Sequence, residues 1–261
     1  MIRLWALVAR ELRSQFVSPV AWAVVAGYVL LDGYFFFNLV SRFGMMLQRY
    51  EVHARIYRDP AVLAAINLND LVVAKLFMNQ ILLLVFIIPA LTMRTFAEER
   101  RQGTDELLLT APVGPGTVVA GKFIGVLAVC ALLVAASAGF LGIVMYFGDP
   151  ETGPMWTGLL GLSLVATALT ALGIAVSAAT DSQVVAGVGA FALFLMLFIV
   201  AWTAEAVGGT GAALLRGLSL PGHFESFRDG VLTSPDVIYY LSLTALGLFS
   251  ARAILASHRW R

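Results

Sequence analysis

The chain has 261 residues, of which 60% are hydrophobic and only 13% are charged, and its mean hydropathy is +0.88. A soluble globular domain carries charge on about a quarter of its residues, so this composition excludes that class and indicates a bundle of membrane-spanning helices. The net charge of +1 and the lack of a long basic run argue against nucleic acid as a partner, because phosphate binding needs a clustered positive surface.

The N-terminal stretch, residues 1–18, has an amphipathic pattern and carries Arg3, Arg10, Glu11 and Arg13. The apolar run that follows is too long for the core of a signal peptide, and no small-residue cleavage pattern accompanies it. We therefore expect the first span to be retained.

Six apolar runs match the ~20 residues that a helix needs to cross a bilayer. They cover roughly residues 19–40, 74–93, 118–147, 156–179, 183–202 and 237–256. An even number of spans places both termini on one side, and a slight excess of basic residues on that side favours the cytoplasm. The predicted fold class is an all-α membrane protein with six transmembrane helices in a single domain, residues 1–261.

Two long segments lie on the opposite, outer side. In the first, residues 42–71, apolar and aromatic residues recur at helical spacing from Met46 to Tyr57, which favours an interfacial helix. The second, residues 205–236, mixes apolar and charged residues. We expect part of it to be a re-entrant pair broken at Pro221-Gly222, with a flat interfacial helix as the alternative. The residues assigned to this outer segment are Pro221, Gly222, His223, Phe224 and Phe227.

The most polar inner segment, residues 94–113, joins the second span to the third. Gly103 is placed as the left-handed terminator of a short helix, and Thr104 can cap the next one. Pro112 should stop that second helix, so the pattern predicts an elbow of two helices under the membrane. A solvated connecting loop is the alternative.

A family resemblance covers nearly the whole chain. It is carried by TMRTFAEER at residues 92–100, GTDELLLTAPV at 103–113, GKF at 121–123, PGHFESFRDGV at 221–231, DVIYYLS at 236–242 and RELRSQFVSP at 10–19. Together these runs resemble the permease subunits of ABC-2 type transporters, and within them the gliding-motility-associated GldF-like group. In that family the 94–113 equivalent is a cytoplasmic coupling helix that docks on a separate ATPase, and the N-terminal segment is an amphipathic elbow.

The resemblance implies roles for named residues. ATPase coupling is assigned to Arg94, Phe96, Glu98, Glu99, Arg100, Gly103, Thr104, Glu106 and Leu107. It also implies that ATP and Mg²⁺ bind two copies of a partner ATPase, and that a second permease subunit, identical or related, completes the unit. A periplasmic or membrane-anchored auxiliary protein and membrane lipids are further expected partners, and the expected location is the bacterial inner membrane.

The run from Gly116 to Lys122 fits a phosphate-binding loop except that Phe123 replaces the required Ser or Thr. We therefore expect no nucleotide there and interpret Lys122 as reaching the inner headgroups.

Asp32 lies within the first span, where an ionisable group is costly enough to mark a functional candidate. The alternative is a hydrogen-bonded group that faces a neighbouring helix.

The predicted function is that of a non-catalytic permease subunit. It would couple ATP hydrolysis by the partner to export or movement of a substrate, and would bind no metal or cofactor itself. The alternative is a mechanotransmission or scaffold subunit that relays ATPase work to an outer partner and moves no cargo. An intramembrane enzyme lacks its parts, because no G-x-S-x-G elbow and no second intramembrane aspartate accompany Asp32.

Overall fold

The computed structural model describes residues 2–57, 67–101, 103, 114–207 and 215–258. Within this part of the chain every regular element is a helix, and there is no strand. Six of these helices are long and apolar enough to cross a membrane, which confirms the predicted fold class. They are α2 (Pro19–Tyr57), α4 (Ala74–Thr92), α7 (Pro115–Phe147), α8 (Thr152–Ala178), α9 (Gln183–Val207) and α12 (Ser234–His258).

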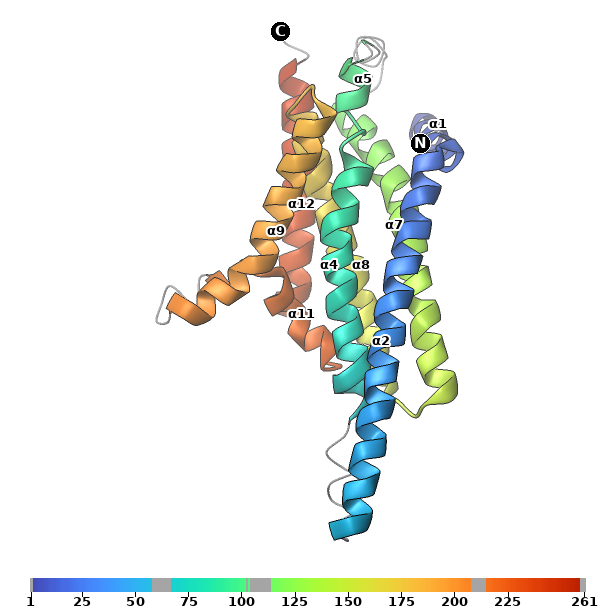
Figure 1. Cartoon of the computed structure of the whole chain (residues 1–261). Coiled ribbons are helices and arrows are strands. Elements are labelled where there is room, and N and C mark those ends of the chain that lie inside the picture. Colours follow the sequence, from blue (N-terminus) through green and yellow to red (C-terminus); the bar gives the residue numbers. More distant parts are fainter. Residues whose placement is uncertain (1, 58–66, 102, 104–113, 208–214, 259–261) are drawn as a thin grey trace.

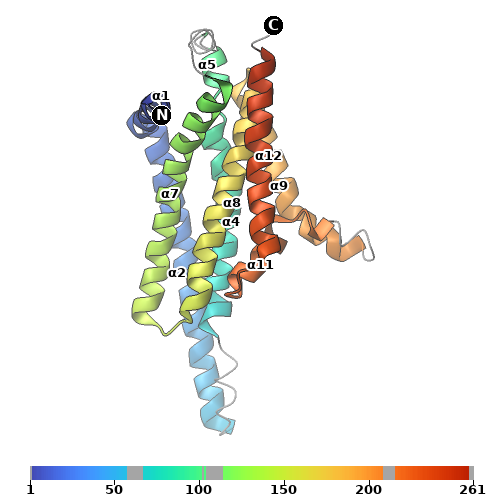
Figure 2. The same cartoon turned by 180° about the vertical axis from the view of Figure 1, so that it is seen from behind.

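Helix α8 is the centre of the bundle, because α4, α7, α9 and α12 all pack against it (Figures 1 and 2). The closest of these contacts is with α12. A Cβ atom at Gly247 of α12 would lie 2.5 Å from the backbone carbon of Ala171 on α8, so only glycine allows this approach. Small residues let two helix backbones approach where lipid supplies no hydrophobic drive.

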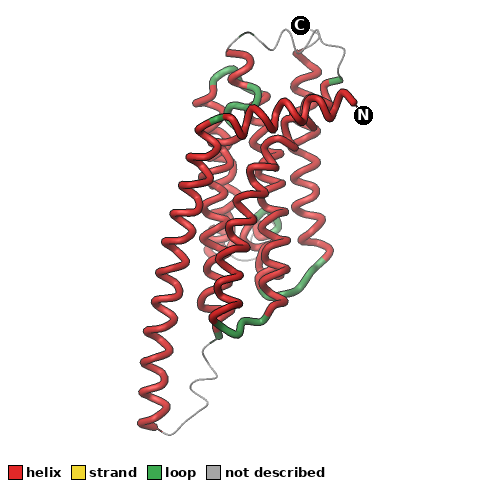
Figure 3. The backbone as a smooth tube through the Cα atoms, turned by 90° about the vertical axis from the view of Figure 1, so that its right-hand side faces the viewer, coloured by secondary structure: helices red, strands yellow, loops and turns green. Residues whose placement is uncertain are grey.

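Helix α2 differs from the expectation. It continues without a break to Tyr57, so the separate interfacial helix predicted after the first span is wrong, and that stretch is an extension of the span itself. Its 39 residues reach about 58 Å at 1.5 Å per residue, roughly twice the ~30 Å of a bilayer's hydrocarbon core. The extension projects beyond the rest of the molecule (Figures 1 and 3).

Short elements close the two ends of the bundle. At one end, α1 (Ile2–Val17) lies across the long helices (Figure 3), and α5 (Ala97–Arg101) and the C-terminal end of α12 lie at this same end of the bundle. At the other end lie α11 (Leu220–Arg228), the turn between α7 and α8, and the π-helical turn η1 (Asn69–Val73), which runs into α4. Both ends of the chain therefore share one face of the bundle.

The side chain of Asn69 joins the N-terminal ends of α4 and α8. The amide of Asn69 in η1 donates to the carbonyl of Glu151 at 3.1 Å, and its oxygen accepts from the Glu151 backbone nitrogen at 3.2 Å. This paired hydrogen bond satisfies backbone groups just before α8 begins. It sets the position of the α7–α8 turn relative to α4.

Replacing Gly247 by Ala should lower the stability of the bundle. The new methyl group would meet backbone atoms of α8, which cannot move aside as a side chain can, and overpacking of this kind costs about 1–3 kcal/mol. The matched control is Gly142→Ala on α7, where a Cβ meets nothing within 4 Å. Thermal unfolding of the purified chain in detergent should show a lower midpoint for Gly247→Ala only; equal midpoints for the two variants would contradict the close α8–α12 packing.

Candidate functional site

The region where α4 gives way to α5 is built around one serine of α8. Ser177 Oγ accepts hydrogen bonds from the backbone nitrogens of Phe96 at 3.1 Å and Ala97 at 3.4 Å, and donates to the carbonyl of Met93 at 3.2 Å. These three groups lie where the helical hydrogen-bond pattern is interrupted and would otherwise lack partners. A single hydroxyl, which can accept two hydrogen bonds and donate one, therefore fixes the turn of residues 93–96 to α8.

A buried cation lies on the other side of this turn. Lys122 of α7 is only 3% exposed, and its Nζ lies 2.8 Å from Glu99 Oε1 and 3.6 Å from Glu11 Oε1. The ammonium also lies 5.0 Å from the centre of the Phe96 ring, within cation–π range. The expectation that Lys122 reaches the headgroups is therefore wrong: its charge is used to bind α1, α5 and α7 together.

Arg10 extends the same set of charges. Its guanidinium lies 2.9 Å from Glu11 Oε1 and 3.5 Å from Glu99 Oε1, so both carboxylates are shared between Lys122 and Arg10. The hydrogen bond to Glu11 raises the pKa of the Arg10 guanidinium. We call these four side chains, Arg10, Glu11, Glu99 and Lys122, the charge cluster. It balances two cations against two carboxylates, which is the condition for charges to be tolerated where water is scarce.

Helix α1 can reach this cluster because it crosses α7 at glycine. A Cβ at Gly125 would lie 2.9 Å from the Cβ of Glu11, so a larger residue at that position would push α1 away. The spacing Gly121-x-x-x-Gly125 belongs to this crossing, where Gly121 faces Leu7. These small residues bring the Glu11 carboxylate within reach of Lys122.

A second ion pair ties α5 to the opposite side of the bundle. Arg100 lies 3.2 Å from Asp181, in the turn between α8 and α9. The Arg100 side chain is largely buried and Asp181 is exposed, so solvent weakens the pair. Glu99 thus pairs with Lys122 of α7, and Arg100 pairs with Asp181 in the α8–α9 turn. Ion pairs therefore hold α5 on both sides.

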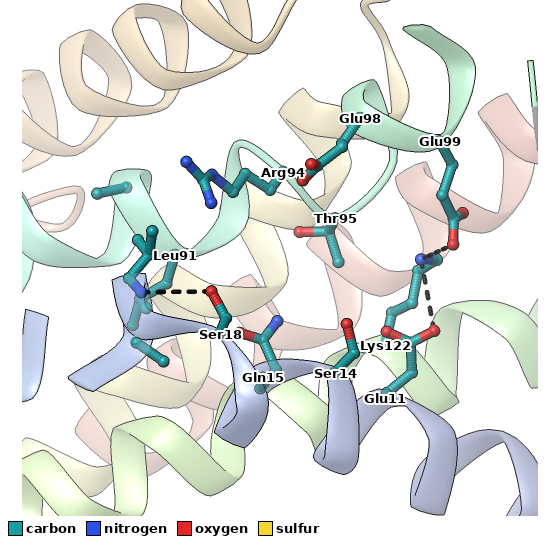
Figure 4. Close-up of a pocket in the computed structure, with 13 residues that line it drawn as sticks. Glu11, Ser14, Gln15, Ser18, Leu91, Arg94, Thr95, Glu98, Glu99 and Lys122 are labelled. Atoms are coloured by element: carbon teal, nitrogen blue, oxygen red, sulfur yellow. Dashed lines mark hydrogen bonds and ion pairs between the residues drawn. The ribbon is translucent and has the colours of Figure 1, made fainter. Parts of the chain in front are cut away.

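Charged and polar groups line a cavity between α1 and the α4–α5 turn (Figure 4). Its volume is about 370 Å³. The close-up shows Ser14 and Gln15 on α1, and Ser18 between α1 and α2, across from Arg94, Thr95 and Glu98. The charge cluster forms one end of this cavity, because Glu11, Glu99 and Lys122 also line it.

The structure brings the described members of the expected coupling set together. Arg94, Glu98 and Glu99 line the cavity, Phe96 is buried beneath Lys122, and Arg100 reaches Asp181. Gly103 has a φ of +67°, the left-handed conformation predicted for a helix terminator. Thr104, Glu106 and Leu107 lie outside the described residues. What the structure shows is attachment to the bundle; the role in coupling stays a prediction.

Sequence reasoning missed four members of this site. Ser177, Asp181, Glu11 and Arg10 come from other helices, and nothing in their local sequence links them to residues 94–101. One signal in the sequence could have linked Glu11 to this site. Glu11 in the amphipathic start and Lys122 in the first turns of a span carry opposite charges, and both are expected near the same membrane edge.

The predicted outer segment also has a defined place. Helix α11 begins at Leu220, with Ser219 Oγ accepting from Gly222 N at 3.0 Å and Pro221 in the first turn. Leu220, Phe224 and Phe227 are fully buried, because α11 packs on α8, α9 and α4. Pro221 and Gly222 thus lie in the first turn of a helix that packs against the bundle (Figures 1 and 2), and a re-entrant position in the membrane stays a prediction.

The carboxylate of Asp236 on α12 binds side chains of α11 and of the turn that follows it. Asp236 Oδ1 lies 2.7 Å from Nδ1 of His223, and Oδ2 accepts from the hydroxyls of Ser226 and Thr233. The His223 ring stacks on Tyr239, with 3.9 Å between ring centres. Tyr240, one residue further along α12, donates from its hydroxyl to the Leu220 carbonyl at 2.8 Å.

Asp32 is fully buried and faces α4. Its two carboxylate oxygens lie 3.3 and 3.0 Å from Nε2 of Gln80, and the Tyr28 hydroxyl lies 2.6 Å from Ser137 Oγ one turn away. Asp32 is thus hydrogen-bonded to a neighbouring helix, the arrangement of the alternative interpretation. The structure does not bring it near the charge cluster, and a functional role for it stays a prediction.

Replacing Lys122 by Met should destabilise the chain strongly. Removing the cation leaves the Glu99 and Glu11 carboxylates with only Arg10 to balance them, and breaking a buried ion pair costs about 3–5 kcal/mol. Lys75→Met, at an exposed position near the start of α4, should stay within about 0.5 kcal/mol. Thermal unfolding in detergent measures both, and adding Glu11→Gln and Glu99→Gln to Lys122→Met should restore part of the loss. An unfolding midpoint of Lys122→Met equal to that of the wild type would contradict the structural role of the charge cluster.

Comparison with protein families gives one match over most of the chain. The family model described as ABC-2 family transporter protein matches residues 5–232, which include α1, the charge cluster, the cavity and α11. Comparison with curated proteins found no match.

Proposed function

The chain belongs to the ABC-2 family of transporter proteins, and from this premise we propose that it converts ATP hydrolysis on a separate ATPase into movement of its membrane helices. Membership supports a permease subunit of an ABC transporter. The proposed unit is two such permeases, identical or related, with two ATPases that hold ATP and Mg²⁺. The proposal extends to the gliding-motility-associated GldF-like group, which the runs quoted in the sequence analysis resemble.

This function is supported by the way in which α5 is fastened. Three separate helices hold it: α8 through Ser177, and α1 and α7 through the charge cluster. A displacement of α5 by a partner would therefore move all three helices rather than bend a loose connection. Coupling requires a rigid element with two arrangements that the partner can bias. The attachment of α5 to three helices supports its rigidity.

The surface offered to the partner is narrower than the sequence suggested. Of the described residues in this segment, Phe96, Glu99 and Arg100 turn toward the bundle, whereas Arg101 and Gly103 are exposed. We propose that Arg101 and the following residues 104–113 contact the ATPase, while Glu99 and Arg100 transmit its motion. Docking and transmission would then depend on different side chains.

A second function is favoured by the extension of α2. If the termini are cytoplasmic, residues 42–57 stand as a rigid helix well outside the membrane, and Met45, Met46, Tyr50 and Val52 are exposed on it. A transporter that only moves a substrate has no evident use for such a rod. A subunit that relays ATPase work to a periplasmic or membrane-anchored partner does, and this remains the alternative to substrate movement.

Arg101→Glu and Glu99→Gln should separate docking from transmission. In the complex of permease and ATPase purified from its own membrane, Arg101→Glu should release the ATPase, because it reverses a charge at the contact. Glu99→Gln should keep the ATPase bound but reduce its activity to that of the ATPase alone, because Lys122 loses its nearest partner. Copurification and ATP hydrolysis are the measurements.

The controls for this pair are Arg42→Glu and Glu51→Gln, which lie at exposed positions on the α2 extension. Neither control should change copurification or ATP hydrolysis. Full copurification and full stimulation in both Arg101→Glu and Glu99→Gln would contradict the proposed function.

The orientation can be tested with single cysteines in a Cys130→Ala background. Cysteines at Arg49 and Asp149 lie at the end of the bundle opposite to α1, at exposed positions, and should react with an impermeant maleimide added to intact cells. A cysteine at Arg13 on α1 should react only after the membrane is made permeable. Reaction at Arg13 in intact cells, or at only one of the other two, would overturn the proposed topology.

A further inference from the structure

The cavity between α1 and the α4–α5 turn is large enough for a small molecule and is lined unevenly. Its volume of about 370 Å³ falls within the roughly 300–1,000 Å³ typical of ligand sites. Polar and charged side chains form most of its wall. Four apolar residues of the spans α2 and α4 close the side toward the bundle: Val20, Ala21, Ala90 and Leu91.

Arg94 is the lining residue whose hydrogen bonding is incomplete. Its Nε is buried and has no hydrogen-bond partner among the described residues. The Nε itself is shielded from any occupant, but the Arg94 guanidinium lines the cavity and forms no ion pair with a described residue, so its terminal nitrogens favour an occupant that supplies an acceptor. Phosphate and carboxylate oxygens match the planar fork of arginine best.

The remaining charges favour a zwitterionic occupant over a simple anion. Glu11, Glu98 and Glu99 line the same cavity as Arg94 and Lys122, and Arg10 shares Glu11 and Glu99, so three carboxylates stand against three cations and the site is neutral as a whole. Ser14, Gln15 and Thr95 add neutral hydrogen-bonding groups. An occupant with a phosphate at one end and an amine at the other would satisfy both signs; a simple anion would meet the carboxylates unfavourably.

The position of Trp22 indicates the depth of the cavity in the membrane. Trp22, one residue after the lining residue Ala21, is exposed on α2, and its indole nitrogen donates to the Phe16 carbonyl at 2.8 Å. Exposed tryptophans that combine an apolar ring with one satisfied polar group are typical of the headgroup level of a bilayer. The cavity therefore opens at the depth where phospholipid headgroups lie.

We propose that this cavity binds the headgroup of a zwitterionic phospholipid with a primary amine, such as phosphatidylethanolamine. The phosphate would accept from Arg94, and the ammonium would lie toward the carboxylates of Glu98 and Glu11. Such a lipid would join the elbow helix α1 to the end of α4. The site depends on this chain alone and does not require the ATPase.

The proposal can be tested on the full chain purified in detergent and stripped of lipid. Binding of phosphatidylethanolamine and of phosphatidylglycerol from mixed micelles is measured by native mass spectrometry. The wild type should retain phosphatidylethanolamine in preference to phosphatidylglycerol. Arg94→Gln should weaken that binding by at least about ten-fold, the effect of losing a charge-assisted hydrogen bond, and Arg94→Lys should lose less. The matched control Arg42→Gln, on the exposed α2 extension, should bind as the wild type does.

Three results would overturn the proposal. They are equal retention of phosphatidylethanolamine by wild type and Arg94→Gln, binding of phosphatidylglycerol as tight as that of phosphatidylethanolamine, and displacement of the lipid by excess inorganic phosphate, which would point to a soluble phosphate instead. The unfolding midpoint of Arg94→Gln shows whether the variant is folded; a misfolded variant is replaced by Arg94→Lys, for which unchanged binding relative to Arg42→Gln contradicts the proposal.

Discussion

The buried ammonium of Lys122 is the constraint on which the end of the molecule that holds α1 and α5 depends. A cation that is 3% exposed must have its charge balanced nearby, since an unpaired buried charge costs several kcal/mol. The two carboxylates that balance it come from α1 and α5, and Arg10 shares them. Three elements that are distant in sequence are therefore held at one point. The crossing of α1 over Gly125 makes this meeting possible, and the Phe96 ring and the cavity both adjoin Lys122.

The two ends of the bundle are stabilised by different means. At the end that holds α1 and α5, charges of both signs join these short helices to the spans, whereas at the opposite end α11 is held by apolar burial of Phe224 and Phe227 and by hydrogen bonds to Asp236. Ion pairs can be rearranged by a charged partner, while a buried apolar helix resists displacement. This asymmetry suits a molecule in which force enters at α5 and the far end moves as a unit.

The sequence predicted those features that depend on local properties. Apolar runs of spanning length identified all six helices, because length and hydrophobicity are read within one segment. Gly103 was placed correctly because a left-handed helix end favours glycine wherever it occurs. A helix after the first span was predicted, but as a separate interfacial helix, because charged residues beyond position 41 end the apolar run; its continuity with the span was missed.

Features that depend on partners from other helices could not be predicted in the same way. A lysine at the start of a span is expected to reach the headgroups, and only the packing of α1 against α7 shows that Glu11 and Glu99 meet Lys122 instead. The same holds for Ser177, whose neighbours in sequence give no sign that its hydroxyl supports the turn after α4. A short helix after the second span was thus predicted correctly, but which of its residues face the bundle was decided by tertiary contacts, and its role in coupling stays a prediction.

The central claim is that the charge cluster makes α1, α5 and α7 one mechanical unit. The most direct measurement is the distance distribution between spin labels at the exposed positions Arg13 and Arg101, obtained by double electron–electron resonance in a Cys130→Ala chain. The account predicts one narrow distribution in the otherwise native chain and a clearly broader one when Lys122 is replaced by Met. Equal widths in the two chains would show that α1 and α5 are positioned by something other than the charge cluster, and would contradict the account.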